Sequence, residues 1–522
     1  MGQNDKSEFK NVDIVIVGAG LAGLTAANEL RKKNRSFLVL EARNRVGGRT
    51  WTKIDPDPDP KYWIDMGAQW IGPTHKNILA LADEMKVKTI SGYPKEGDVA
   101  VLYEGKVYTF NINHDNHKDT GFLSLLIGFY RDNFKDVYDE YQEAWHWLDK
   151  EANTLPKGEP WLAKNARELD SKTVQSWMDE HLKTEGAKFI IETMFLLGFA
   201  SIPADVSLLH LLYYIRCAGF SEGLNTGLYY RFEGGSQAVA NATEKVLNEK
   251  VKKGCRVSQI RTEKDGRVTV SWTGENQDRH QCQAKQVIVA LPPALIPKIN
   301  FVQAPIMSGM QTLSALPASR RQFNQRMPMG TSIKCHLVYE EQFWMKKEWM
   351  LTDQKLAGIV FVQNRDIGFI ANSSEPGENK PGIIGCFIET RKIREKYIDF
   401  DENKIVELVT KAVEEVFEKI RYSLISEHLG SDPKIRFPPT PKPKKVYVAN
   451  WSKEEWSEGC YAGVMAPGVW TGFRNTLREP VGPIHWAGTE TANEWFAYMD
   501  GAVQSGKLAA AAVDKELGGQ KS

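Results

Sequence analysis

Three glycines and one acidic residue near the N-terminus have the pattern of a dinucleotide-binding site. Gly18, Gly20 and Gly23 form GxGxxG in "GAGLAG", and Glu41 closes the next apolar run. Such glycines allow a tight turn, a close approach of the backbone to a pyrophosphate and close helix packing, while the carboxylate accepts hydrogen bonds from ribose hydroxyls. A merely glycine-rich turn is the alternative, but the four residues together favour a dinucleotide site.

The stretch "RNRVGGRT" indicates which dinucleotide is bound. It places Gly48 in a second glycine pair, flanked by Arg43, Arg45 and Arg49. Cations and free backbone N–H groups beside the first phosphate loop suit a large flavin dinucleotide, FAD, better than NAD. A solvated basic turn is the alternative interpretation of these arginines.

Cys460 and Lys334 are the two nucleophilic side chains that stand out. The six cysteines have no CxxC or zinc spacing, so we expect no metal site and a reducing compartment. Cys460 lies beside Tyr461 in "WSEGCYAG", where Gly459 leaves room for a close approach to a reactive ring. A buried structural cysteine is the alternative. Lys334 lies in the apolar stretch "MGTSIKCHLV", where a lysine is costly to bury unless it is paired or reaches solvent.

The elements that position these residues follow from apolar patterning. "DIVIV" is a buried strand, "LTAANELRKKN" a helix and "SFLVLEAR" a second strand ending at Glu41, which together form a βαβ unit. Residues 115–220 are predicted to form a helical lobe. "RVSQIRTEKDGRVTVSW" reads as a hairpin and "AKQVIVALPP" as a buried strand. Residues 306–445 mix strands with a helix near 402–420.

Composition excludes several classes of function. The chain has 522 residues and a formal net charge of +1, so no basic excess indicates nucleic acid binding. The opening "MGQNDKSEFK" lacks the apolar region of a signal peptide, and "KLAAAAVDKELGGQKS" offers no membrane-spanning run. We therefore expect a cytoplasmic protein with no membrane span.

Several longer motifs resemble those of the flavin-containing amine oxidases over nearly the whole chain. They are "VDIVIVGAGLAGLTAANEL", "LEARNRVGGRTWT", "IDMGAQWIGPTHKNI" and "HWAGTETANEWFAYMDGAVQSGKLAA". Within that family, "ANWSKEEWSEGCY" is most similar to the monoamine oxidases. The resemblance implies an α/β fold: a doubly wound FAD-binding domain from residues 1–95, 225–305 and 445–522, and an interleaved α+β substrate domain with a helical lobe from 96–224 and 306–444.

The resemblance also implies roles for individual residues. Cys460 would be bonded through sulfur to the 8α-methyl carbon of FAD. Tyr461 and Tyr498 would bracket the substrate nitrogen, and Lys334 would hold a water near flavin N5. Trp451 would pack on the flavin edge. The other implied FAD contacts are Gly67, Ala68, Gln69, Trp70, Val257, Gly488, Thr489, Glu490 and Met499, the last of which opens the C-terminal helix beneath the flavin.

The implied activity is oxidation of primary or secondary monoamines by O₂. An imine would hydrolyse to an aldehyde and ammonia or an amine, with release of hydrogen peroxide; the resemblance leaves a homodimer open. An L-amino acid oxidase, a polyamine oxidase and a non-catalytic flavin-bearing protein are the alternatives. Thr74 and His75 stand where the L-amino acid oxidases place a carboxylate-gripping arginine, which favours the monoamine reading. Leu228, where we expect a polar residue, and a long stretch at 306–326 leave the substrate preference open.

Overall fold

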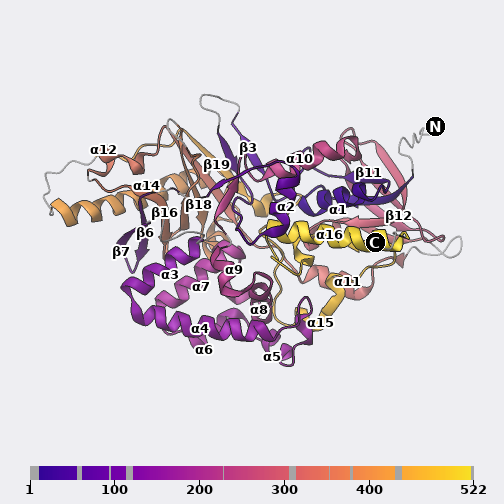
Figure 1. Ribbon diagram of the computed structural model, residues 1–522, viewed down its shortest axis with the longest axis horizontal. Coiled ribbons are helices and arrows are strands. Elements are labelled where there is room, and N and C mark those ends of the chain that lie inside the picture. The colour runs from indigo at the N-terminus through magenta and orange to yellow at the C-terminus, as the bar shows by residue number, and fades with distance from the viewer. Residues whose placement is uncertain are drawn as a thin grey trace.

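The computed structural model describes residues 11–55, 62–92, 94, 96–112, 121–226, 228–304, 313–351, 353–376, 380–429 and 438–518. Two large sheets lie at opposite ends of the molecule, and a group of helices lies below the second sheet in Figure 1. The first sheet has 9 strands and the second has 7 in the described part of the chain.

The first sheet contains the predicted βαβ unit. Strand β1 (Val12–Val17) pairs in parallel with β2 (Phe37–Leu40), and helix α1 (Leu21–Lys32) connects them. The apolar side chains of β1 and β2 are buried, as expected for parallel strands covered on both faces. Because β2 ends at Leu40, Glu41 stands at the carboxyl end of the strand, where ligands of such sheets bind.

Strands from distant parts of the chain complete this sheet. Parallel pairs join β2 to β9 (Val251–Lys252), β1 to β12 (Arg279–Val289), and β12 to β20 (Ile484–Trp486). The predicted hairpin is present as the antiparallel strands β10 (Arg256–Thr262) and β11 (Val268–Thr273), and β13 (Asn300–Gln303) and β14 (Leu313–Ser314) extend the edge.

Helix α16 (Met499–Glu516) packs on α1 and on α2 (Lys76–Glu84), and α10 (Gln237–Leu247) also contacts α1 (Figure 1). A glycine allows the closest of these contacts, because a Cβ on Gly506 would lie 2.3 Å from the carbonyl oxygen of Ala22. Helix α16 is therefore held close to α1.

The second sheet positions Lys334. Its strands, in spatial order, are β19 (Lys445–Asn450), β15 (Ile333–Tyr339), β18 (Gly382–Ile388), β17 (Ile367–Asn372), β16 (Leu356–Val362), β6 (Asp98–Tyr103) and β7 (Lys106–Asn111). The long helix α14 (Glu402–Leu429) shares a core with this sheet. Side chains alternate along a strand. Ile333 and Cys335 join the α14 core, and Lys334 points to the opposite face.

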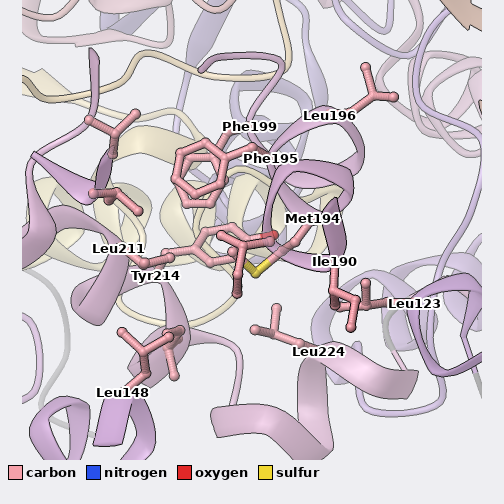
Figure 2. Close-up of a cluster of buried hydrophobic side chains, with 14 of the residues drawn as sticks. Leu123, Leu148, Ile190, Met194, Phe195, Leu196, Phe199, Leu211, Tyr214 and Leu224 are labelled. Atoms are coloured by element: carbon pink, nitrogen blue, oxygen red, sulfur yellow. The ribbon is translucent and has the colours of Figure 1, made fainter. Parts of the chain in front are cut away.

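The predicted helical lobe is confirmed. Its helices are α3 (Phe122–Asn133), α4 (Lys135–Thr154), α5 (Ala166–Ser171), α6 (Val174–His181), α7 (Glu185–Gly198), α8 (Leu208–Cys217) and α9 (Phe220–Thr226). Figure 2 shows the apolar core between them, in which the rings of Phe195, Phe199 and Tyr214 lie close together. Burying each large apolar side chain contributes roughly 1.5–3 kcal/mol, so this lobe is a rigid support.

Smaller elements complete the fold: β3 (Thr52–Ile54) with β4 (Trp63–Asp65), β5 (Thr89–Ser91) with β8 (Tyr230–Phe232), and the short helices α11 (Ala318–Gln325), α12 (Lys347–Met350), α13 (Thr390–Lys392) and α15 (Val469–Phe473). The predicted α/β class with an α+β region is confirmed. The domain limits stay a prediction; β19 begins at the proposed limit of 445 and pairs with β15 of the second sheet.

Two sequence expectations concern membrane-spanning helices and the stretch at 306–326. Within the described ranges, no helix is long and apolar enough to cross a membrane. The stretch at 306–326, singled out for its length, lies partly outside the described residues; its described portion contains α11.

Candidate active site

A cavity of about 210 Å³ gathers almost all of the predicted site residues. Its walls come from the turn before α1, the end of β2, the segment at 67–70, strand β15, the loop at 456–461 and the start of α16. Gly23 and Glu490 are the two predicted residues that do not line it. The others do: Gly18, Gly20, Glu41, Arg43, Gly48, Arg49, Gly67, Ala68, Gln69, Trp70, Val257, Lys334, Trp451, Cys460, Tyr461, Gly488, Thr489, Tyr498 and Met499.

The GxGxxG turn leaves open space before a helix N-terminus. Gly20 is the N-cap residue of α1 and has no side-chain cap, and a Cβ built on it would meet no atom within 4 Å. Gly18 has φ +102°, and a Cβ there would lie 2.7 Å from the carbonyl oxygen of Ala290. A Cβ on Gly23 would lie 2.0 Å from the Gly18 oxygen, so Gly23 serves helix packing rather than the wall.

Glu41 links the glycine turn to the end of β2. Its side chain is buried, and its two carboxylate oxygens accept hydrogen bonds from the N–H of Ala19 at 2.7 Å and of Arg43 at 3.0 Å. A carboxylate oxygen can accept more than one hydrogen bond. Glu41 therefore orders the turn and keeps the capacity to accept from a ligand hydroxyl.

The arginines after β2 bind protein groups. Arg43 pairs with Glu454 at 3.2 Å and donates to Ser457. Arg49 forms a bidentate salt bridge with Glu490, with N–O distances of 2.6 and 3.1 Å. It also donates to the carbonyl oxygen of Tyr461 at 2.7 Å. Glu490 is thus a structural partner that ties this turn to the loop carrying Cys460 and Tyr461.

Two glycines let the Cys460 segment approach its neighbour closely. Gly459 has φ +135°, and a Cβ on it would lie 2.3 Å from the carbonyl oxygen of Gly330. The N–H of Cys460 donates to that same oxygen at 3.0 Å, and the peptide bond between Cys460 and Tyr461 is cis. Burial raises the pKa of the Cys460 thiol to about 12, so the protein environment holds it as a thiol.

Tyr461 and Tyr498 both line the cavity, and both are tied to the helical lobe. The Tyr461 hydroxyl donates to the carbonyl oxygen of Leu196 at 3.2 Å. The Tyr498 hydroxyl shares a 2.6 Å hydrogen bond with that of Tyr214, and the two rings stack at 5.9 Å. Burial raises the pKa of Tyr498 to about 12 and that of Tyr461 further, so both side chains are neutral phenols.

Lys334 is buried beneath the cavity floor. Its Nζ donates to the carbonyl oxygens of Asp65 at 2.7 Å and Gly67 at 3.0 Å, and to Oε1 of Gln69 at 2.7 Å. Burial lowers the pKa of Lys334 to about 7; the nearby Arg231 charge lowers it as well, while Asp65 opposes both. Lys334 therefore anchors the segment at 67–70 that forms one wall.

The wall around Lys334 and the tyrosines is largely apolar. Lys334 Nζ lies 5.2 Å from the ring centre of Trp70 and 5.5 Å from that of Phe387. Sequence reasoning missed Phe387, and it also missed Leu197, Gly198 and Ser332, which line the cavity too. These residues come from β18, α7 and the approach to β15, and no local motif marks them.

The structure corrects one expectation about the substrate. Thr74 is exposed and His75 is fully buried, and neither residue lines the cavity. The position that the resemblance compares with a carboxylate-gripping arginine therefore does not line the cavity, and the identities of Thr74 and His75 do not decide between amines and amino acids by direct contact.

The cavity fits a dinucleotide with a reactive ring at one end. The N-termini of α1 and α16 both open onto it, and neither carries a side-chain cap, so free N–H groups and the positive ends of two helix dipoles meet there. Space in front of Gly20 suits a pyrophosphate, and Cys460, Lys334 and the tyrosines line the same cavity.

Comparison with known families decides the class. The family model "Flavin containing amine oxidoreductase" matches residues 21–514. The chain belongs to this family. The predicted FAD cofactor and the oxidoreductase class are confirmed at this level.

Curated relatives match this chain over nearly its whole length. The chain is 34% identical to the flavin-containing amine oxidase of Oncorhynchus mykiss over 97% of this chain and 86% of the relative. It is 30% identical to the flavin-containing amine oxidase A of Sus scrofa over the same shares. An L-amino acid dehydrogenase of Synechocystis sp. is 31% identical over 96% of this chain and 94% of the relative.

Solved structures show the same architecture. Cyclohexylamine oxidase from Brevibacterium oxydans superposes with a TM-score of 0.78 at 25% identity, covering 97% of this chain and 100% of that one. Wild-type putrescine oxidase bound to putrescine gives a TM-score of 0.77 at 25% identity, covering 97% and 99%. Relatives that act on different amines thus share this fold, so the substrate must be argued from the cavity.

Proposed function

We propose that the protein is an FAD-dependent oxidase of primary and secondary monoamines. For a primary amine, the amine, O₂ and water would give an aldehyde, ammonia and hydrogen peroxide, with an imine as the compound that water hydrolyses. FAD, when bound, supplies the acceptor for the two electrons taken from the C–N unit of the amine.

The apolar wall around the tyrosine pair carries this proposal. Among the described residues that line the cavity, Glu41 is the carboxylate, and it belongs to the glycine turn at the end of β2. The second ammonium group of a diamine would therefore find no partner beside Tyr461 and Tyr498. An unpaired buried charge costs several kcal/mol, so this wall favours a substrate with one amine.

The arginines that line the cavity argue against an amino acid as the substrate. Arg43 and Arg49 are paired with Glu454 and Glu490, and Arg256 is exposed. A substrate carboxylate beside the tyrosine pair would lack the forked partner that binds such groups. This separates the proposed activity from that of an L-amino acid oxidase.

The side chains of the site have separate tasks. Tyr461 and Tyr498 present neutral aromatic faces, which attract an amine without a fixed negative charge that would hold it protonated. Lys334 holds the wall at 67–70, and deprotonation near its pKa of about 7 would remove one of the three donations of Nζ and free a lone pair that could accept a hydrogen bond from a water. The N-terminus of α16 faces the cavity, where it would stabilise negative charge on the bound cofactor.

We also propose that Cys460 carries the flavin as an 8α-S-cysteinyl thioether, formed with loss of the S–H hydrogen and one methyl hydrogen, whose electrons and protons pass to O₂ as hydrogen peroxide. Cys460 lines the cavity, is buried, and is a free cysteine. The test is acid precipitation of the purified protein, since a thioether bond survives unfolding. Flavin should stay in the pellet of the wild type and move to the supernatant for Cys460→Ala. Free flavin from the wild type would contradict the linkage.

Butylamine and putrescine test the proposed activity as a matched pair, because they differ by one terminal amine. Peroxide should form faster with butylamine, because the added ammonium of putrescine finds no carboxylate beside the tyrosines. Faster turnover of putrescine would instead favour a polyamine-type oxidase. Flavin reduction without peroxide would indicate a dehydrogenase, and no reaction with any amine would indicate a flavin-bearing binding protein.

A further inference from the structure

A buried histidine lies behind the tyrosine pair and has no part in the site described above. His75 stands immediately before α2 and is fully buried. Its Nδ1 accepts a hydrogen bond from the backbone N–H of Gly72 at 3.1 Å, so that nitrogen carries no proton. In a neutral imidazole the proton then lies on Nε2.

The imidazole of His75 contacts two aromatic rings, and its buried Nε2 atom has no hydrogen-bond partner among the described residues. The imidazole contacts Trp495, with ring centres 4.0 Å apart and planes inclined at 64°, and Tyr498, with ring centres 5.3 Å apart and planes inclined at 63°. Trp495 and Tyr498 also contact each other at 5.0 Å and 82°. An aromatic face is a weak acceptor for an N–H group that would otherwise be unpaired.

Trp495 and Tyr498 belong to a turn with an unfavourable backbone conformation. Trp495 has φ +49° and Ala497 has φ +72°, in the left-handed region that side chains other than glycine rarely adopt. Such residues persist when the surrounding structure holds them, and they cluster at functional sites. Here Tyr498 follows directly and is the N-cap residue of α16, so the turn sets the direction in which its ring enters the cavity.

Other contacts hold this turn to the end of α8 and to the start of α16. The N–H of Trp495 donates to the carbonyl oxygen of Cys217 at 2.9 Å, which ties the turn to α8. A Cβ on Gly501 would lie 2.2 Å from the Trp495 oxygen, so α16 packs closely against the turn. Asp500 of α16 accepts from the N–H of Ile78 at 2.9 Å, which holds the first turn of α2, immediately after His75, against the start of α16.

We propose that His75 is a positioning residue for the tyrosine pair: it is neutral, carries its proton on Nε2, directs this N–H at the rings of Trp495 and Tyr498, and thereby holds the turn that presents Tyr498 to the cavity. Burial lowers the pKa of His75 to about 3, in agreement with a neutral ring. The effect on turnover rests on the proposed amine oxidase function, whereas the tautomer does not.

The tautomer is tested by NMR of the flavin-loaded protein with ¹⁵N-labelled histidine. The signals that disappear in His75→Gln and in His75→Phe belong to His75. They should show an unprotonated Nδ1 and a protonated Nε2 at pH 7. A proton on Nδ1, or on both nitrogens, would overturn the proposal whatever the enzyme oxidises.

Kinetics test the positioning role through a double-mutant cycle. His75→Leu should lower kcat/KM for phenethylamine by about tenfold, because small displacements of a positioning group are costly, with the flavin still bound. His75→Gln, which keeps an acceptor and an N–H donor, should lose less. In a Tyr498→Leu background His75→Leu should add almost nothing, whereas in the matched Tyr461→Leu background its tenfold effect should persist. Equal losses in both backgrounds would overturn the positioning role, and an inactive wild type would instead count against the proposed function.

Discussion

The two ends of the cavity are built by opposite means. The end that we propose binds the dinucleotide, called here the dinucleotide end, uses backbone from two short segments between Gly18 and Arg49, where the essential feature is missing side chains. The end that we propose binds the amine, called here the amine end, uses side chains from separate segments, such as Lys334 on β15, Phe387 on β18 and Tyr498 at the start of α16. The first end depends on free space and backbone N–H groups, and the second depends on rings held in place by contacts outside the cavity.

This difference predicts how each end fails. A substitution at the dinucleotide end should act by occupying space, so it should remove the cofactor from a folded protein. A substitution at the amine end should leave the cofactor bound and change the rate. The following experiments test this division in order of decreasing effect.

Gly20→Val should abolish flavin binding. Gly20 has an extended backbone conformation that valine also adopts, and the new side chain would enter open space before α1. The protein should therefore fold and purify without its yellow colour, as the ratio of flavin to protein absorbance would show. Gly472→Val on α15 is the matched control, since a Cβ there also meets no atom, and it should keep its flavin. A fully loaded Gly20→Val protein would place the dinucleotide elsewhere.

Tyr498→Leu should lower kcat/KM for a monoamine by roughly 10- to 100-fold, because the aromatic face beside the amine is lost. Tyr498→Phe should be milder, since the ring remains and only the hydrogen bond to Tyr214 is removed, a loss of about 0.5–1.5 kcal/mol. The measurement is kcat/KM of the two variants by steady-state kinetics, with their flavin content determined in parallel. Equal effects of the two changes would assign the role to the hydroxyl or to packing.

Glu41→Ala should weaken FAD binding by about 1–3 kcal/mol, because a charged hydrogen-bonding group is removed from the turn. The measurement needs a Cys460→Ala background, in which binding is reversible, and titration of the apoprotein with FAD gives the two dissociation constants. Unchanged affinity would place Glu41 away from the ribose and assign it to the glycine turn alone.

The buried lysine should make stability depend on pH. The folded pKa of Lys334 is about 7, against an ordinary value of 10.5. Between these pH values the unfolded chain binds a proton that the folded chain does not, so the free energy of unfolding rises with pH across that window. Lys334→Met should remove this part of the rise. Denaturant titrations of both proteins at several pH values test it, and parallel pH curves would contradict the lowered pKa.

The sequence alone predicted the dinucleotide end well because its signal is local. The GxGxxG turn, Glu41 and the βαβ unit lie within one short stretch, and their spacing reflects backbone geometry. Strands of the second sheet between residues 306 and 445 and the helical lobe were also recognisable from apolar periodicity, whereas β6 and β7 were not predicted. Cys460, Tyr461 and Tyr498 were found through resemblance to a family, and the structure brings them to one cavity.

The remaining features depend on packing between distant segments. Arg49 was expected beside a phosphate, but it pairs with Glu490, 441 residues away in the chain, which spacing cannot reveal. His75 was compared only with the carboxylate-gripping arginine of the L-amino acid oxidases, but it does not line the cavity and packs against Trp495 instead. Phe387 and Tyr214 carry no motif, and only the folded sheet and helical lobe bring them to the site.

The relative kcat/KM for phenethylamine and L-phenylalanine tests the central claim most directly. The two compounds share ring and chain length and differ by a carboxylate, for which the described wall around Tyr461 and Tyr498 offers no free arginine. Because a buried unpaired carboxylate costs several kcal/mol, phenethylamine should be preferred by at least about a hundredfold, as measured by peroxide release from one preparation. Faster peroxide release from L-phenylalanine would contradict the monoamine assignment and favour an L-amino acid oxidase.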